Sequence, residues 1–328
     1  MKKSTWLFIF LLIFSVLITI SANNWISMWI GLELNMMSFI PLIMSNKTKY
    51  SSEASMMYFF VQSMSSTLLV MMVMCMMYNY SIKINMIKDL LTISLLIKLG
   101  AAPFHMWMPE MMSKMQWMSS ATLMTWQKIA PMMMISNIYN NYYIINMSVM
   151  LSVIIGSVGG VNQVSLRKLM GYSSINHLGW MLAINKNINL WMSYIMIYST
   201  LIIMMCYMFN NIKVYFLNQM NSMNFNETQK ISLFILMMSM GGLPPLMGFL
   251  PKWITVQTMV NSEEYMMLMI MIMCSLITLM YYMRVMTKMF LTFSSSIKWS
   301  KTNYNPFMYM IMNMVNLSLP LIMIMDII

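Results

Sequence analysis

The chain contains very few charged side chains. Asp, Glu, Lys and Arg make up 8% of its 328 residues, whereas they make up about a quarter of an ordinary soluble domain. Hydrophobic residues account for 60% of the sequence, and the mean hydropathy is +0.68. Such a chain cannot cover its own surface with polar groups. This excludes a soluble globular protein and predicts a protein folded in a lipid bilayer.

Cysteine and histidine are scarce as well. The three cysteines, Cys75, Cys206 and Cys274, lie inside apolar runs, where packing is expected rather than disulfide formation or metal binding. His105 and His177 are the only histidines, so no redox metal or cluster site is predicted. The sequence also lacks the Gly-x-Gly-x-x-Gly pattern of nucleotide-binding folds. We therefore expect the chain to bind no cofactor itself.

The basic residues are scattered singly. The net charge is +11, but a nucleic-acid groove requires a clustered basic face, so nucleic acid is excluded as a partner. The 55 methionines are a second bias of composition. We interpret them as drift under a genetic code that reads an isoleucine codon as methionine, as in the mitochondria of many animals. They indicate where the chain is encoded rather than what chemistry it performs.

Apolar runs fill most of the chain. Residues 1–23 resemble a secretory signal, but the rest is just as apolar, so we interpret them as an uncleaved first membrane helix. A spanning helix needs about 20 apolar residues, and about eleven segments meet this length. We predict a single all-α polytopic membrane domain. The segments are 5–20, 25–44, 55–78, 89–108, 119–139, 144–161, 169–185, 188–209, 231–260, 265–290 and 305–325.

The loops between these segments differ in charge. If the loops alternate sides, one side carries only Lys83, Lys88 and Lys186. The other side carries Lys2, Lys3, Lys47, Lys49, Lys114, Arg167, Lys168, Lys213, Lys230, Lys298 and Lys301. The positive-inside rule then places the N-terminus in the cytoplasm or matrix and the C-terminus on the opposite side.

One motif occurs twice. The stretches GAAPFHMWMPE, Gly100–Glu110, and GLPPLMGFLPK, Gly242–Lys252, share the pattern Gly-x2-Pro-x5-Pro-charge. They fall in the fourth and ninth segments, so a five-helix unit is used twice. Because five is odd, the second copy enters the membrane from the opposite side. We therefore predict two inverted repeats, 5–139 and 144–293, and a C-terminal helix at 305–327.

The motif also predicts that both helices are discontinuous. Proline removes a backbone donor and opens a helix. Interrupted helices in matching positions of inverted halves indicate an ion pathway in secondary transporters. Simple proline kinks are the alternative interpretation, and they explain one break better than two matched ones.

Four charged residues lie within or beside apolar segments: Glu33, Lys98, Lys128 and Lys252. Each charge near the bilayer centre costs about 2.5–3.5 kcal/mol on insertion scales, so such residues usually have a function. Burial favours the neutral form of an amine, and a nearby carboxylate favours its charged form. Our hypothesis is that Glu33 and Lys98 form a proton switch, Lys128 relays the proton, and Lys252 passes it toward the far side. The alternative is a set of static ion pairs that hold helices together.

The two histidines are secondary candidates. His177 lies in the second helix of the second repeat, where Glu33 lies in the first, and is a possible proton carrier. A hydrogen-bonded packing role is the alternative. His105 follows the first break near Glu110, and either a structural role or a role at the entry of the path fits it.

Several stretches resemble one family in the same order over nearly the whole chain. They read WIGLELNMMSFIPL, KLGAAPFHMWMPE, TWQKIAP, RKLMGYSSINHLGWM and GLPPLMGFLPKW. Together they resemble the NADH dehydrogenase subunit 2 family of mitochondrial respiratory complex I, which is similar to Mrp-type cation/proton antiporter subunits. One departure is Gly171, where the family motif usually has alanine.

The resemblance implies a role for each buried charge. Glu33 and Lys98 match the family's glutamate–lysine pair, Lys128 its central lysine, and Lys252 the lysine on the second broken helix. It further implies proton translocation coupled to oxidation of NADH by ubiquinone, in an enzyme whose NADH, FMN, Fe–S clusters and ubiquinone are bound by other subunits. The implied setting is the mitochondrial inner membrane, with membrane-arm subunits of the complex, antiporter-like ones included, and lipids such as cardiolipin as partners.

Two other functions stay open from the sequence. One is a stand-alone secondary cation/proton antiporter, and the other is a purely structural spacer in a membrane assembly. The methionine bias and the lack of a soluble domain favour a subunit of an organelle-encoded complex.

Overall fold

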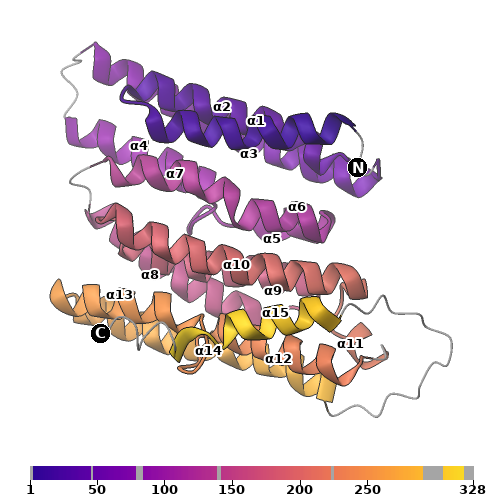
Figure 1. Ribbon diagram of the computed structural model, residues 1–328. Helices are drawn as coiled ribbons and strands as arrows, with labels where there is room; N and C mark the ends of the chain where they lie inside the picture. Colours follow the sequence, from indigo (N-terminus) through magenta and orange to yellow (C-terminus); the bar gives the residue numbers. More distant parts are fainter. Residues whose placement is uncertain are drawn as a thin grey trace.

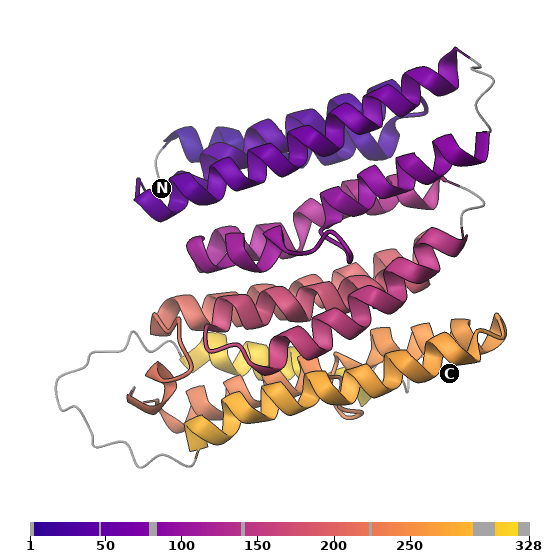
Figure 2. The same cartoon turned by 180° about the vertical axis from the view of Figure 1, so that it is seen from behind.

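The computed structural model describes residues 3–45, 47–78, 84–138, 142–222, 225–290 and 306–320. These ranges contain helices and no β-strand, with one isolated bridge between Ser165 and Phe216. The predicted all-α class is therefore confirmed. The helices run roughly alongside one another and stack in tiers that follow the order of the chain (Figures 1 and 2).

The first tier contains three helices at the N-terminal edge. They are α1 (Lys3–Ser21), α2 (Trp25–Ile43) and α3 (Lys49–Met77). Thr48 begins α3 with a capping box, in which its hydroxyl accepts from the Ser51 amide at 3.3 Å. The helices α1 and α2 pack closely at Gly31, where a Cβ atom would collide with the Thr19 side chain. Small residues allow this approach because packing between membrane helices depends on close contact of their backbones.

The second tier is more fragmented than the sequence predicts. It contains α4 (Ile84–Leu99), α5 (Trp107–Lys114), α6 (Trp117–Met124) and α7 (Trp126–Ser136). The predicted segment 89–108 is broken after Leu99, as its motif indicates. The predicted segment 119–139 is also interrupted, at Thr125, whose backbone leaves helical geometry with φ −112° and ψ −75°. Thr125 Oγ1 donates to the carbonyl of Ala121 at 2.8 Å, the kind of bond by which threonine disturbs helices.

The third tier lies at the centre of the molecule. It contains α8 (Tyr142–Val161), α9 (Leu166–Ala183) and α10 (Ile188–Ile212). A Cβ atom on Gly156 of α8 would lie 2.6 Å from the backbone nitrogen of Asn176 in α9. Glycine on α8 therefore lets α9 lie directly against it, which fixes the position of the α9 side chains.

The last tier contains the second broken helix. Its elements are α11 (Gln219–Ser222), α12 (Glu227–Gly241), α13 (Phe249–Asn261), α14 (Tyr265–Phe290) and α15 (Pro306–Asn316). The predicted segment 231–260 is therefore α12, a loop and α13. The amide of Met247 in this loop donates to the carbonyl of Asn316 at 3.0 Å, so the end of α15 holds the loop. The predicted C-terminal helix, 305–327, begins at Pro306, and residues 305 and 321–327 lie outside the described residues.

Five helices in the described ranges are long and apolar enough to cross a bilayer. They are α2, α3, residues 143–161 of α8, α10 and α14. Large apolar side chains stay exposed on these helices; Met266 of α14, for example, is 81% exposed. This is typical of a surface that faces lipid or other membrane helices. The count of about eleven spans and the inverted repeats stay predictions.

Candidate functional site

The two helix breaks have the same local geometry. Gly100 follows α4 with φ +68°, and Gly242 follows α12 with φ +82°, a left-handed conformation that glycine adopts without steric cost. The next amide then bonds to a carbonyl five residues back: Ala101 to Leu96 at 3.1 Å, and Leu243 to Met238 at 3.3 Å. This is the Schellman helix ending. The matched motif therefore terminates both helices in the same way.

Lys252 lies at the second break. It belongs to the first turn of α13, and its side chain turns back toward the end of α12. Its Nζ atom donates to the carbonyl of Gly241 at 2.7 Å and lies 5.8 Å from the centre of the Trp180 ring. Lys252 is only 6% exposed. The break therefore presents the ammonium group with a carbonyl at the negative end of a helix dipole.

Lys98 lies just before the first break, in the last turn of α4. It is 6% exposed, and no hydrogen bond or ion pair joins its Nζ atom to another group in the described ranges. Glu33 of α2 is partly buried, and its Oε1 atom has no hydrogen-bond partner. The charge of Glu33 acts on Lys98, but the two do not form an ion pair within 4 Å. The structure thus places them in one region without contact.

Lys98 and Lys128 border the same small cavity. Its volume is about 20 Å³, which is enough for roughly one water molecule. The cavity separates the end of α4 from the start of α7. Four neutral polar side chains also line it, namely Asn35, Tyr58, Gln62 and Gln127. These four residues were not predicted from the sequence.

Three of these polar side chains form a hydrogen-bonded network beside the cavity, and the fourth, Gln62, bonds separately to α4. Tyr58 Oη donates to Gln127 Oε1 at 3.1 Å, and Gln127 Nε2 donates to Asn35 Oδ1 at 3.0 Å. Gln62 Nε2 donates to the carbonyl of Lys98 at 3.2 Å, in the last turn of α4. The network links α2, α3 and α7, and the Gln62 bond links α3 to α4. Their amides in otherwise apolar segments are a sequence signal, since such side chains need partners inside a membrane.

Lys128 faces the third tier. It is 3% exposed and lies in the first turn of α7, directly after the interruption at Thr125. Its Nζ atom donates to the carbonyl of Ser174 in α9 at 3.0 Å and lies 5.2 Å from the centre of the Tyr198 ring. The interruption thus exposes a lysine of the second tier to α9.

One face of α9 connects the two remaining lysines. Ser174, His177 and Trp180 are spaced three residues apart, so they lie on the same side of the helix. Ser174 contacts Lys128, and Trp180 contacts Lys252. His177 lies between them and experiences the charges of both lysines. The structure therefore brings Lys128, His177 and Lys252 together along this face.

His177 belongs to a buried aromatic cluster. It is 5% exposed, and its Nδ1 atom lies 2.8 Å from Tyr194 Oη. Tyr198 packs against the ring with centroids 4.8 Å apart. The hydroxyls of Tyr198, Tyr281 and Tyr282 are buried and have no hydrogen-bond partner among the described residues. Buried hydroxyls in this state are favourable sites for ordered water.

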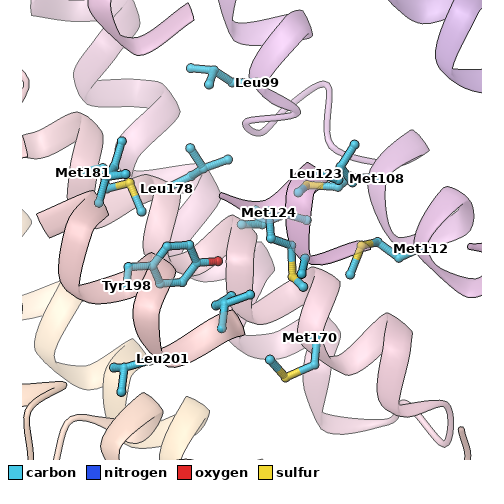
Figure 3. Close-up of a cluster of buried hydrophobic side chains, with 14 of the residues drawn as sticks. Leu99, Met108, Met112, Leu123, Met124, Met170, Leu178, Met181, Tyr198 and Leu201 are labelled. Carbon is cyan, nitrogen blue, oxygen red and sulfur yellow. The ribbon is translucent and has the colours of Figure 1, made fainter. Parts of the chain in front are cut away.

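Apolar side chains surround this polar path. Figure 3 shows a cluster contributed by several tiers, with Leu99 and Met108 near the first break and Leu178 and Met181 on α9. Met108 lines the cavity, and its sulfur lies 3.6 Å from Ser174 Oγ. Charges interact more strongly in such a medium than in water.

The other sequence candidates lie apart from this path. His105 is 9% exposed, and its Nδ1 atom lies 3.2 Å from the carbonyl of Pro103 within the first break. It forms no ion pair with Glu110, whose side chain is exposed. Among the described residues, no group of three or more His, Cys, Asp or Glu side chains could hold a metal ion.

Residues 22–278 match a family model, which is described as 'NADH:quinone oxidoreductase/Mrp antiporter, TM'. Curated relatives are named NADH-ubiquinone oxidoreductase chain 2. The chain of Anopheles gambiae is 44% identical over 93% of the present chain and 92% of its own length. That of Aedes aegypti is 42% identical over 95% and 91%, respectively.

Two solved structures share the fold. A chain of respiratory complex I from Thermus thermophilus, determined with bound aureothin, aligns with a TM-score of 0.84 and 18% identity over 98% of this chain and 79% of that chain. A chain of the Mrp complex from Dietzia sp. aligns with a TM-score of 0.79 and 16% identity. The alignment covers 90% of this chain and 61% of that chain.

Proposed function

The chain belongs to the transmembrane family of NADH:quinone oxidoreductase and Mrp antiporter subunits, and from this premise we propose that it is the proton-translocating chain 2 of an NADH–ubiquinone oxidoreductase. Electrons pass from NADH to ubiquinone in other subunits of that complex. Relatives with this name match more than nine tenths of the chain. We further propose that the chain binds no cofactor of its own and that its neighbours are other membrane-arm subunits of the complex.

The proposed proton path runs from Glu33 and Lys98 through Lys128 and His177 to Lys252. The cavity between Lys98 and Lys128 provides space for a water molecule to carry the proton. The α9 face then leads past His177 to Lys252. A change in the separation of Glu33 and Lys98 would alter how firmly Lys98 holds its proton.

The observation that carries this proposal is the burial of three lysines without carboxylate partners. Lys98, Lys128 and Lys252 are at most 6% exposed, and none forms an ion pair within 4 Å in the described ranges. The alternative of static ion pairs that hold helices together would require such partners. Lys128 and Lys252 instead donate to backbone carbonyls, an arrangement that a change of protonation can alter.

A stand-alone antiporter is the second candidate. The likeness to the Mrp complex favours it only at the level of fold, because the identity is 16%. The names of the much closer relatives favour a subunit of a respiratory enzyme. Native electrophoresis separates the two functions: migration only within a large respiratory assembly supports the subunit, and an isolated functional chain supports the antiporter.

The proposed setting is the mitochondrial inner membrane, with the N-terminus on the matrix side and the C-terminus on the intermembrane-space side. In the described ranges, Lys49, Lys114, Lys168, Lys213 and Lys230 lie at one end of the helix stack, on the right in Figure 1. This distribution supports the orientation, because basic residues stay on the matrix side. Other residues used in that prediction, Lys2, Lys83, Lys298 and Lys301, lie outside the described residues. Cardiolipin and other lipids are proposed to surround the apolar helices.

The test replaces Lys98 or Lys252 by methionine in the assembled complex. Loss of a proton carrier should reduce proton-coupled turnover by about 10²-fold or more, measured as NADH-driven proton uptake in sealed vesicles. The matched control is Lys47→Met, because Lys47 is exposed and outside the path. Unchanged pumping in both path variants would refute the proton-path role.

A further inference from the structure

A large polar cleft lies outside the proton path. Its volume is about 830 Å³, within the range of about 300–1,000 Å³ that is common for ligand sites. The starts of α3 and α9, the end of α5 and the segment after α10 form its walls. The elements that form its walls lie at one end of the helix stack (Figures 1 and 2), the end at which Lys49, Lys114 and Lys168 occur.

The floor of the cleft is held in place by backbone bonds. The amide of Leu166 donates to the carbonyl of Tyr215 at 2.9 Å, and the amide of Leu217 donates to the carbonyl of Val164 at 3.0 Å. Arg284 of α14 further donates to the carbonyl of Gln163 at 2.9 Å. Segments distant in sequence are thus tied together, so the cleft is formed before any ligand arrives.

The cleft carries uncompensated positive charge. It is lined by Lys114, Arg167 and Lys168 and by no carboxylate. Lys114 is paired with Glu53 at 2.9 Å. Arg167 and Lys168 form no ion pair within 4 Å among the described residues. Two positive charges therefore face the cleft without a neutralising partner from this part of the chain.

Two buried polar atoms at the cleft lack partners. They are Arg167 Nε and Ser165 Oγ. Arg167 is held in place on its other side, because its Nη1 atom donates to the carbonyl of Met115 at 2.6 Å and its guanidinium lies 4.7 Å from the centre of the Tyr215 ring. Both atoms are covered by neighbouring protein atoms, whereas the Arg167 side chain as a whole is partly exposed. A guanidinium held in one orientation is suited to an oxyanion.

We propose that this cleft binds a phosphate group, through Arg167 and Lys168. Its rim favours an anionic phospholipid as the source of the phosphate. Val164 and Phe216 also line the cleft and are 54% and 47% exposed, so they offer an apolar surface to the start of an acyl chain. A soluble phosphate compound shares the headgroup chemistry but gains nothing from this rim.

The test uses the intact complex after removal of lipid. Its thermal stability is measured against vesicles of phosphatidylcholine with phosphatidylglycerol, against vesicles of phosphatidylcholine alone, and against inorganic phosphate. Binding to the folded state raises the unfolding temperature. The double variant R167Q/K168Q should raise the half-maximal phosphatidylglycerol concentration about tenfold or more, since it removes charge-assisted hydrogen bonds.

Two further variants keep the test decisive. Lys213→Asn removes a charge from the same end of the molecule outside the cleft, and asparagine tolerates the φ of +60° found there; it should behave as the native chain. Lys168→Gln is used if the double variant does not assemble, because the Lys168 side chain forms no ion pair with the described residues. A weakened response to inorganic phosphate alone would support the site with a soluble source. Equal responses of native and variant complexes to both ligands would overturn the proposal, and proton pumping by the variants is irrelevant to that outcome.

Discussion

Buried ammonium groups in this chain are accommodated by backbone carbonyls and aromatic rings. Lys128 and Lys252 each donate to one carbonyl and lie near one ring. Lys98 differs, because it faces a cavity and has no such carbonyl. Lys98 therefore has a different environment from the two later lysines of the proposed path.

The sequence identifies the charged residues of the site but not the neutral ones. Charges stand out because their cost in a bilayer is large, whereas Gln127 and Asn35 resemble many scattered amides. Their importance depends on which face of each helix points inward. The contact of Lys128 with Ser174 joins residues 46 positions apart, and local periodicity contains no information on such a pair.

Gln127 provides a test at this level. Gln127→Leu should leave Tyr58 Oη and Asn35 Oδ1 without partners, which costs about 1–3 kcal/mol for each buried group. A lower unfolding temperature of the complex and reduced proton pumping are expected. Gln257→Leu is the matched control, because Gln257 is exposed on α13. Equal stability of the two variants would show that the network does not contribute.

The two broken helices are the elements whose structure agrees best with the prediction from the sequence. Both glycine–proline motifs predict interruptions, and the structure has them after Leu99 and Gly241. The interruption at Thr125 was not predicted, because neither glycine nor proline marks it. It arises from backbone torsions that only the surrounding packing selects, and it determines where Lys128 points.

Gly242→Ala tests the role of the second break. The φ of +82° is unfavourable for alanine, and the added Cβ atom would lie 2.7 Å from Lys252 Cδ. The variant should lose about 1 kcal/mol or more of stability and reduce proton pumping, because Lys252 must move. Gly171→Ala is the control: it lies inside α9 without a positive φ, and alanine favours helix by up to about 1 kcal/mol. Full activity of Gly242→Ala would contradict the proposed role of the break.

Across the whole molecule, the basic residues near helix ends and the buried lysines are distributed differently. Most basic residues near helix ends in the described ranges lie at one end of the stack, with Lys88 and Lys186 at the other. Among the buried lysines, Lys98 and Lys128 lie in the second tier and Lys252 lies in the last. The composition predicts the membrane class because it concerns averages over the chain. The order of the tiers depends on contacts between distant segments, which the sequence indicates only through the repeated motif.

The proposed orientation can be measured with single cysteines. In mitoplasts, a membrane-impermeant maleimide should label Lys186→Cys without permeabilisation and label Lys47→Cys only after it. Both lysines are exposed and lie at opposite ends of the helix stack. The native cysteines are buried or partly buried, so the parent chain gives the background. The reverse labelling pattern would reverse the assigned sides.

The most direct test of the proton path concerns Lys128, which connects the cavity to α9. The measurement is the number of protons translocated per electron by the assembled complex in sealed vesicles, with Lys128→Met compared with Lys47→Met. Because methionine fills a similar volume and carries no proton, proton-coupled turnover should fall by about 10²-fold or more, while the control matches the native complex. An unchanged proton-to-electron ratio and rate in a fully assembled Lys128→Met complex would contradict a path through this chain.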